Sequence, residues 1–183
     1  MKNKKIWIAT AALLAISITL VFAAENKTES QDLSQGSYIA DDKETLKGLE
    51  GFHVNIEELK SPIERSGLTT AQIRSDVELR LRQNGIKVLS EEELLAAPGN
   101  PQLYVNVNIL APKDFAVVAY SIVIRVDQAV FLARDTTKKY CATTWNRGST
   151  GIVNRNLSTI RDDVKNKVDE FISDYLAVNP KNK

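Results

Sequence analysis

Apolar and polar positions alternate along several stretches of the chain, which predicts strands with one buried face. Two such stretches span residues 51–57 and 103–109, and a shorter apolar run at 86–89 predicts another strand. A longer extended run covers residues 115–134. Because this run exceeds the usual length of a single strand, we expect it to bend, with a bulge near residues 125–127.

The bent strand is expected to take part in two antiparallel hairpins. Its first half would pair with residues 103–110, and its second half with residues 139–147 across a turn at 135–138. Residues 146–151, Asn-Arg-Gly-Ser-Thr-Gly, then predict a loop that leads toward the last helix. This loop could present backbone amides to an anion, but it lacks the ending of a phosphate-binding loop, which favours an ordinary connection.

Apolar residues that recur every three or four positions predict two main helices. Thr69 and Gln72 have the spacing of a capping box, and the helix that they open would end at Gly85. Ser90 and Glu93 form a second capping box, which opens a brief helix. The last helix is the longest, and its apolar stripe consists of Leu157, Ile160, Val164, Val168, Phe171, Ile172, Tyr175 and Leu176.

The order of these elements, β-α-β-(short α)-β-β-β-α, predicts an α+β fold. We expect a single two-layer domain over residues 48–178, with a mixed or antiparallel sheet of about five strands and both main helices on one face. The core must hold this domain together, because the single cysteine, Cys141, cannot form an intramolecular disulfide. A thiol inside an apolar strand is expected to be buried.

The first 23 residues have the layout of a secretory signal. Three lysines precede an uncharged run from Ile6 to Phe22, and Ala23 suits a signal peptidase. The run is also just long enough to stay uncleaved as an anchor. We therefore expect an exported protein, periplasmic or secreted, or held in the inner membrane by residues 6–24. Polar residues 24–47 would form a flexible tether, and residues 179–183 a short tail.

The charge balance excludes one class of partner. Removing residues 1–23 takes away three of the 24 basic residues and none of the 23 acidic ones, which leaves a net charge of −2. A near-neutral chain lacks the basic surface that nucleic acid requires, so we expect no nucleic-acid partner. Membrane contact would be limited to the N-terminal segment.

The chain offers no catalytic constellation. His53 is the single histidine, and no nearby cysteine or acidic cluster accompanies it as a metal site would require. A Ser-His-Asp triad would have to use His53, and no Gly-x-Ser-x-Gly turn is present. We therefore expect no enzyme activity, no cofactor and no metal.

Polar and aromatic residues of the predicted sheet are the candidate contact surface. Tyr104 and Asn106 share one strand face, and Tyr120 and Arg125 belong to the strand expected beside it. Together they could line a shallow groove or form the wet face of a half-covered sheet. Trp145 could be core or an exposed anchor for a partner. Arg147 follows it in the predicted loop, and these six residues complete the candidate set.

Three segments carry a resemblance to known proteins. The segments GLTTAQIRSDVELRLRQNGIKVLSEEE, LYVNVNIL and DYLAVNP resemble parts of exported bacterial proteins of unknown function. The strand followed by a helix that ends in Gly-Ile-x-Val also resembles the N-terminal domain of TolB proteins and related envelope modules. Those domains serve as docking or assembly units, so the resemblance implies a similar role here, although the chain lacks propeller repeats.

Two functions follow from these features. The first is a non-catalytic module of the bacterial envelope that binds another envelope protein through an exposed strand edge or the sheet face around Trp145. The alternative is a periplasmic carrier of a small ligand, with its pocket between the C-terminal helix and the sheet near Tyr104, Tyr120 and Arg125.

Overall fold

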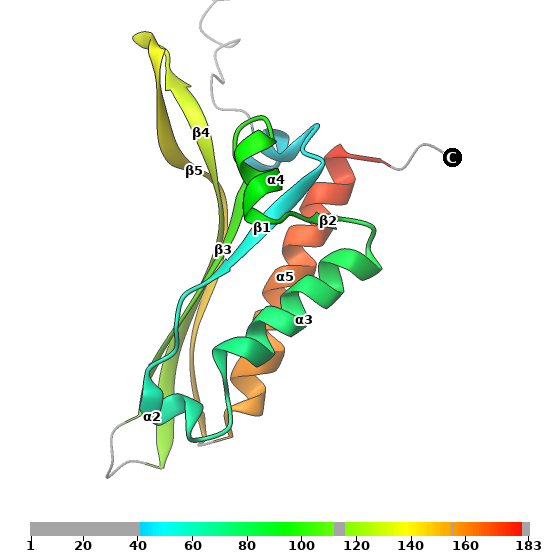
Figure 1. The fold of residues 1–183 in the computed structure, drawn as a ribbon. Coiled ribbons are helices and arrows are strands. Elements are labelled where there is room, and N and C mark those ends of the chain that lie inside the picture. Colours follow the sequence, from blue (N-terminus) through cyan, green and yellow to red (C-terminus); the bar gives the residue numbers. More distant parts are fainter. Residues whose placement is uncertain (1–40, 112–115, 155, 181–183) are drawn as a thin grey trace, which may run out of the picture. The chain divides into compact units, whose positions relative to one another are not determined.

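The computed structural model describes residues 41–111, 116–154 and 156–180, which form one α+β domain with two layers. One layer is a five-stranded sheet in the order β2-β1-β3-β4-β5, and helices cover one of its faces (Figure 1). The expected signal segment, residues 24–40 of the expected tether and residues 181–183 lie outside the described residues.

The elements follow the predicted order, with two short helices added. Their bounds are η1 (Asp42–Leu46), β1 (Gly51–Ile56), α2 (Ser61–Glu64), α3 (Thr70–Gln83), β2 (Lys87–Val88), α4 (Glu91–Ala96), β3 (Gln102–Leu110), β4 (Val117–Leu132), β5 (Asp135–Asn154) and α5 (Ser158–Val178). The predicted α+β class, single mixed sheet and two main helices on one face are confirmed.

The sheet is mixed because helical crossovers precede β2 and β3. Strand β1 pairs in parallel with β2 on one side and with β3 on the other. Strands β3, β4 and β5 then pair antiparallel in sequence order. This arrangement leaves β5 at one edge of the sheet and the two-residue β2 at the other.

Both predicted capping boxes form. Thr69 Oγ1 accepts a hydrogen bond from the Gln72 amide, and Gln72 Oε1 accepts one from the Thr69 amide. Ser90 and Glu93 bond reciprocally in the same way at the start of α4. Each box satisfies two amides that an uncapped helix start would leave without a partner.

The core lies between the sheet and the helices α3 and α5. Helix α3 buries Ile73, Val77 and Leu81, which recur at every fourth position as predicted. Edge-to-face ring contacts join the sheet to α5, with Phe171 packing 5.1 Å from both Phe52 and Trp145 between ring centroids. Such aromatic contacts add to the free energy that burial alone supplies.

Both predicted antiparallel pairings of the long strand are present, but the pairing with β5 extends further than predicted. Strand β4 pairs with β5 along its whole length, and with β3 over residues 119–127. The predicted loop at 146–151 is wrong, since these residues belong to β5. The predicted turn at 135–138 is also wrong, because the reversal takes place at residues 133–134.

The predicted bulge is confirmed. The register between β4 and β5 shifts after Val126, which pairs with Trp145 while Asp127 pairs with Thr143. Thr144 is therefore the extra residue, and its hydroxyl hydrogen-bonds to Gln128 in the adjacent strand. A bulge of this kind increases the local twist of the strand pair.

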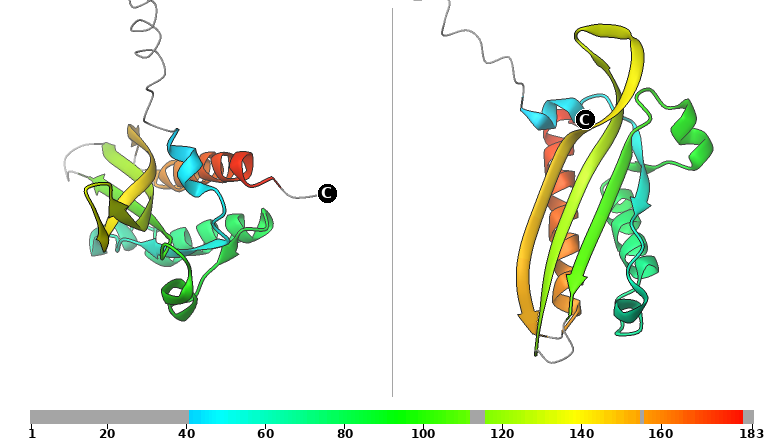
Figure 2. Two further views of the ribbon diagram at one scale, coloured as in Figure 1. Left: turned by 90° about the horizontal axis from the view of Figure 1, so that it is seen from above. Right: turned by 90° about the vertical axis from the view of Figure 1, so that its left-hand side faces the viewer.

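Beyond the bulge the sheet narrows to two strands. At this end of the sheet the last pair between β3 and β4 is Gln102 with Asp127. Beyond it β4 and β5 continue as a two-stranded structure, here called the ribbon (residues 128–142). The ribbon projects past the rest of the sheet in the views of Figures 1 and 2. Cys141 lies on the ribbon and is exposed, so the prediction of a buried thiol is wrong.

The domain begins earlier and ends later than predicted. Residues 42–46 of the expected tether form η1, and Leu46 is fully buried in the core. Asn179 of the expected tail binds the fold as well, since its side chain donates to the Leu46 carbonyl and accepts from the Gly48 amide. The polar composition around Leu46 concealed this attachment.

Candidate binding surface

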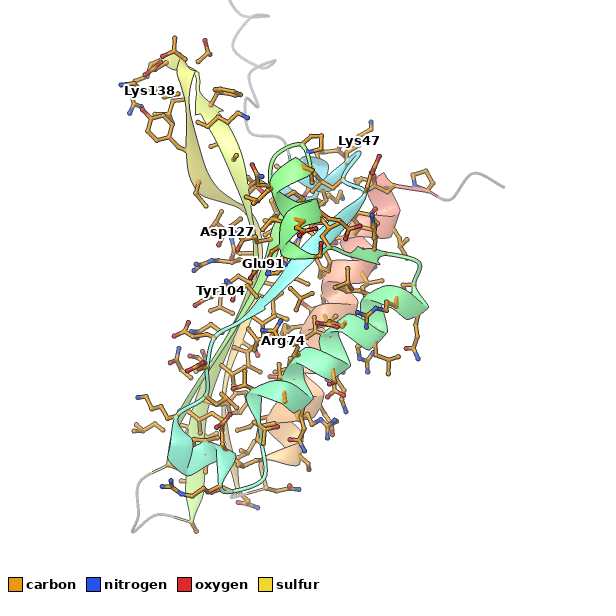
Figure 3. All side chains as sticks on the ribbon, viewed as in Figure 1. Lys47, Arg74, Glu91, Tyr104, Asp127 and Lys138 are labelled. Atoms are coloured by element: carbon orange, nitrogen blue, oxygen red, sulfur yellow. The ribbon has the colours of Figure 1, made fainter. Side chains whose placement is uncertain are left out.

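Strand alternation divides the candidate residues between two faces of the sheet. The helix side carries the core, and the opposite side, here called the outer face, is free of α3 and α5. Tyr104, Asn106 and Arg125 lie on the outer face, out of phase with the buried Leu103, Val105 and Ile124. Figure 3 shows Tyr104 and Asp127 on the side of the sheet away from Arg74 of α3.

A network of polar side chains occupies the half of the outer face nearest the ribbon. Arg125 stacks on the ring of Tyr104, its directly paired neighbour, with 4.2 Å from the guanidinium carbon to the ring centroid. Its Nε donates to Asp127 at 3.0 Å. Thr143 donates to the other oxygen of Asp127 at 2.7 Å, so the network crosses β3, β4 and β5.

Glu57, just after β1, completes the polar network. Its carboxylate accepts hydrogen bonds from the Tyr104 hydroxyl and the Asn106 amide. These two bonds lower the pKa of Glu57, and the bond to the carboxylate raises the pKa of Tyr104. The sequence prediction includes Glu57 in the first alternating stretch but not in the candidate surface, because its position beside β3 comes from the fold.

The end of the outer face away from the ribbon carries an exposed apolar row. Leu110, Ala119 and Ile152 are paired in one row across β3, β4 and β5. Leu110 retains 68% and Ile152 retains 72% of its accessible surface. With Val117 and Val123, two further exposed valines of β4, they form a set that we call the apolar cluster: Leu110, Val117, Ala119, Val123 and Ile152. The polar row Asn108, Ser121 and Thr150 lies between Val123 and the other members.

The apolar cluster was also missed by the sequence prediction, although a signal for it exists. Residues 117–124 are apolar or aromatic at nearly every position, rather than at alternate positions. Such a run is typical of a strand covered on both faces. In the described domain only the helix side of β4 is covered, which leaves the outer side chains exposed.

Tyr120 does not join this surface. It lies five residues before Arg125 in an unbulged strand, so its side chain points to the helix side. There its hydroxyl donates to Asp163 of α5 at 3.2 Å. Burial raises the pKa of Tyr120, and the Asp163 carboxylate adds to the effect. Gly151 pairs with Tyr120 and leaves room for its ring.

Trp145 and Arg147 are also structural residues of the helix side. Trp145 is fully buried, so it cannot act as an exposed anchor, and its indole N–H donates to Asp174 at 3.0 Å. Arg147 stacks on Trp145 and pairs with Asp42 and Asp174, each at 2.6 Å. The hydrogen bond to Asp42 is the main cause of the raised pKa of Arg147. These contacts join η1, β5 and α5.

The predicted ligand pocket is not formed by the residues expected to line it. Tyr104 and Arg125 lie on the outer face, whereas Tyr120 faces α5, so the three cannot line one pocket. A cavity of about 290 Å³ lies elsewhere, between the start of β1, strand β2 and helix α4. Leu49, Pro98 and Pro101 contribute apolar walls, and the ion pair of Lys87 with Glu93 lies at its border.

The described residues contain no group of three or more histidine, cysteine, aspartate or glutamate side chains placed to hold a metal ion. His53 Nδ1 lies 3.1 Å from the Leu89 carbonyl oxygen, a contact that ties β1 to the segment after β2. Among the helices of the described residues, none is both long enough and apolar enough to cross a bilayer.

Comparisons with known proteins leave the family open. No protein-family model matches this chain, and no curated protein matches its sequence. The function of the domain must therefore be inferred from its own surfaces.

Proposed function

We propose that this protein is a non-catalytic module of the bacterial envelope that binds another protein on the outer face of its sheet. The partner would place apolar side chains on the apolar cluster and polar groups around Arg125 and Asp127. The observation that carries this proposal is the row of Leu110, Ala119 and Ile152 across three strands. A row of exposed apolar side chains with polar side chains beside it is typical of protein contact surfaces.

The polar network supports a binding role over a catalytic one. Arg125 is engaged by Tyr104 and Asp127, and Glu57 is engaged by Tyr104 and Asn106. Groups held in this way are preorganised to meet a partner, which reduces the entropy cost of association. Export, which the N-terminal segment predicts, would place the partner in the envelope.

Site-specific photocrosslinking in intact cells tests the proposal. The crosslinking residue is placed at Ile152 of the full chain, and a matched control places it at Leu79, an exposed leucine of α3 in the other layer. We expect one predominant protein product from position 152 and none from position 79. Products of equal yield from both positions would contradict a specific outer-face contact.

Binding of the captured protein must then be shown with purified components. The charged substitutions Leu110→Asp and Ile152→Asp should abolish binding, whereas Leu79→Asp should leave it unchanged. Circular dichroism should give the same melting temperature for all three variants, because each side chain is exposed. Unchanged binding by the Leu110 and Ile152 variants would remove the surface from the proposal.

The cavity beside α4 supports a second candidate, a small-ligand carrier. Its volume of about 290 Å³ lies near the lower end of the range for ligand pockets, and its walls are largely apolar. A ligand bound there should raise the melting temperature in a metabolite and lipid panel. The substitution Ala97→Trp, which fills the cavity, should remove that rise, and a flat response of the native protein would contradict this candidate.

A further inference from the structure

We propose that the ribbon is a membrane-contacting arm whose tip binds the surface of an anionic phospholipid bilayer. This contact is independent of the outer face and would add a second attachment point to the domain. Figure 3 labels Lys138 at the tip of the ribbon and Asp127 at its base. The tip is residues 130–140, where β4 and β5 pair with each other beyond the end of β3.

The base of the ribbon is held by the domain. The Ala129 amide donates to the Gly99 carbonyl at 2.7 Å, and the Gln128 side chain donates to the Thr45 carbonyl of η1 at 3.2 Å. Past these contacts the ribbon is a two-stranded structure, which is marginally stable in water without further packing. A surface that covers the tip would therefore also stabilise it.

The tip carries an exposed aromatic side chain on each of its two faces. Phe131 pairs with Lys139 on one face, and Val130 pairs with Tyr140 on the other. Phe131 retains 52% and Tyr140 retains 40% of its accessible surface. A protein groove usually covers one face of a ribbon, whereas the interfacial region of a bilayer can surround both. Aromatic side chains are favoured in that region.

The charge of the tip matches an anionic surface. Arg134, Lys138 and Lys139 are exposed basic residues, and Asp135 is the single acid of the segment, which gives a net charge of +2. Asp135 is turned into the reversal, where its carboxylate accepts from the Thr137 hydroxyl at 2.6 Å. Each basic residue near an anionic bilayer contributes about 1 kcal/mol to binding.

The chain enters the domain at the same end. Helix η1 lies against the ribbon base through Thr45, whose hydroxyl donates to the Thr144 carbonyl at 3.1 Å. The predicted apolar run ends at Phe22, so the 18 residues 23–40 separate it from the first described residue. Fully extended, that length reaches about 60 Å. An uncleaved anchor would therefore keep the start of the domain, which adjoins the ribbon base, within about 60 Å of the bilayer.

The exposed thiol of Cys141 offers a test in the full chain. An environment-sensitive fluorophore on Cys141 reports lipid contact of the ribbon itself, whether or not the N-terminal segment is also inserted. We expect a blue shift on vesicles of phosphatidylglycerol with phosphatidylcholine, and none on phosphatidylcholine alone. Removing both lysines, Lys138→Ser with Lys139→Ser, should lower the ratio of contacting to free ribbon about thirtyfold, about fivefold for each charge.

Matched controls separate binding by the ribbon from a nonspecific effect of the protein's overall charge or surface hydrophobicity. The pair Lys60→Ser with Arg65→Ser removes two exposed positive charges near α2, away from the ribbon, and should leave the signal unchanged. The substitution Phe131→Ser should weaken the blue shift, and Leu79→Ser, at another exposed site, should not.

Three results would overturn the proposal. The first is an equal blue shift on both kinds of vesicle, and the second is a native-like response of the double lysine variant. The third comes from a photocrosslinker at position 131 in intact cells, if it captures a protein rather than phospholipid. Equal melting temperatures by circular dichroism should accompany every ribbon variant, because none of these side chains lies in the core.

Discussion

At the scale of single residues, the fold separates candidates that lie close together in sequence. Trp145 and Arg147 lie at a glycine-containing part of the sequence that is typical of an exposed loop. In the structure, Trp145 bonds β5 to α5, and Arg147 bonds β5 to both α5 and η1. Arg125, by contrast, reaches the outer face from the middle of an apolar strand. The bulge changes the face on which residues of β5 lie, because its extra residue, Thr144, belongs to β5, whereas the sequence predicts only a bulge near residues 125–127.

Asp174 should prove important for stability, because the buried indole N–H of Trp145 donates to it. The substitution Asp174→Ala leaves that donor without its partner, which costs about 1–3 kcal/mol. Asp162→Ala removes an exposed aspartate of the same helix and should change the free energy of unfolding by less than about 0.5 kcal/mol. Urea unfolding of both variants measures the difference, and similar midpoints would refute the role of Asp174.

Gly151 should be required by the ring opposite it. A Cβ atom at this position would lie 2.6 Å from the Tyr120 hydroxyl and 2.7 Å from two ring carbons. We expect Gly151→Ala to destabilise the domain by about 1–3 kcal/mol through overpacking. In a Tyr120→Val background the same change should be neutral or stabilising. A double-mutant cycle by urea unfolding tests this coupling, and additive effects would contradict it.

At the scale of elements, the sequence predicts well wherever a local signal is sufficient. The two capping boxes, the apolar stripe of α5 and the alternation of β1 and β3 all appear where expected. The predicted strand that corresponds to β5 ends too early, because Gly148 and Gly151 are typical of loops. Each glycine instead lies against a group of β4 that leaves no room for a side chain. Gly148 faces the Ile122 carbonyl, and Gly151 faces the Tyr120 ring. Pairings of that kind become visible only once the strands are aligned.

The candidate surface likewise combines residues that local sequence places correctly with residues that only the strand pairing brings together. Three of its six residues share the outer face as predicted, and parity alone already separates Tyr120 from Arg125. The contribution of Glu57 depends on the parallel pairing of β1 with β3, which places it beside Tyr104. The exposure of Ile152 depends on an edge strand that the sequence prediction replaced by a loop.

The two main helices are joined by ion pairs whose strength should depend on pH. Arg161 of α5 donates to both oxygens of Asp76 of α3, at 2.6 and 2.9 Å. These hydrogen bonds lower the pKa of Asp76, and the charges of Arg161, Lys165 and Arg80 act in the same direction. Since its pKa is lower in the folded state, Asp76 stabilises the fold above its unfolded pKa of about 3.9 and loses this contribution as the pH falls further.

Asp76→Asn should therefore cost about 1 kcal/mol at neutral pH, and the difference from the native protein should shrink below about pH 4. Urea midpoints of both proteins at neutral and at acid pH provide the measurement. Asp162→Asn, which removes an exposed carboxylate bonded within α5, serves as the control. A difference that stays constant with pH would show that the charge of Asp76 is not what joins the helices.

At the scale of the folded domain, its two proposed contacts use different elements and different chemistry. The apolar cluster lies on strands that the core holds firmly, whereas the ribbon tip extends past β3 and is basic. A protein partner on the first and a bilayer under the second could be bound at the same time, because neither set of residues contributes to the other. Variants of one surface should then leave binding at the other unchanged.

The N-terminal boundary of the domain depends on Leu46 of η1. Leu46 is fully buried, and its carbonyl accepts from Asn179 at the end of α5, so η1 closes one end of the core. Truncating a buried leucine removes apolar contacts and leaves a cavity, so Leu46→Ala should cost about 2–5 kcal/mol. Leu79→Ala, at an exposed leucine of α3, should cost less than about 0.5 kcal/mol. If urea unfolding gives equal values for both, residues 42–46 act as the tether that their polar composition predicts, and the core begins at β1.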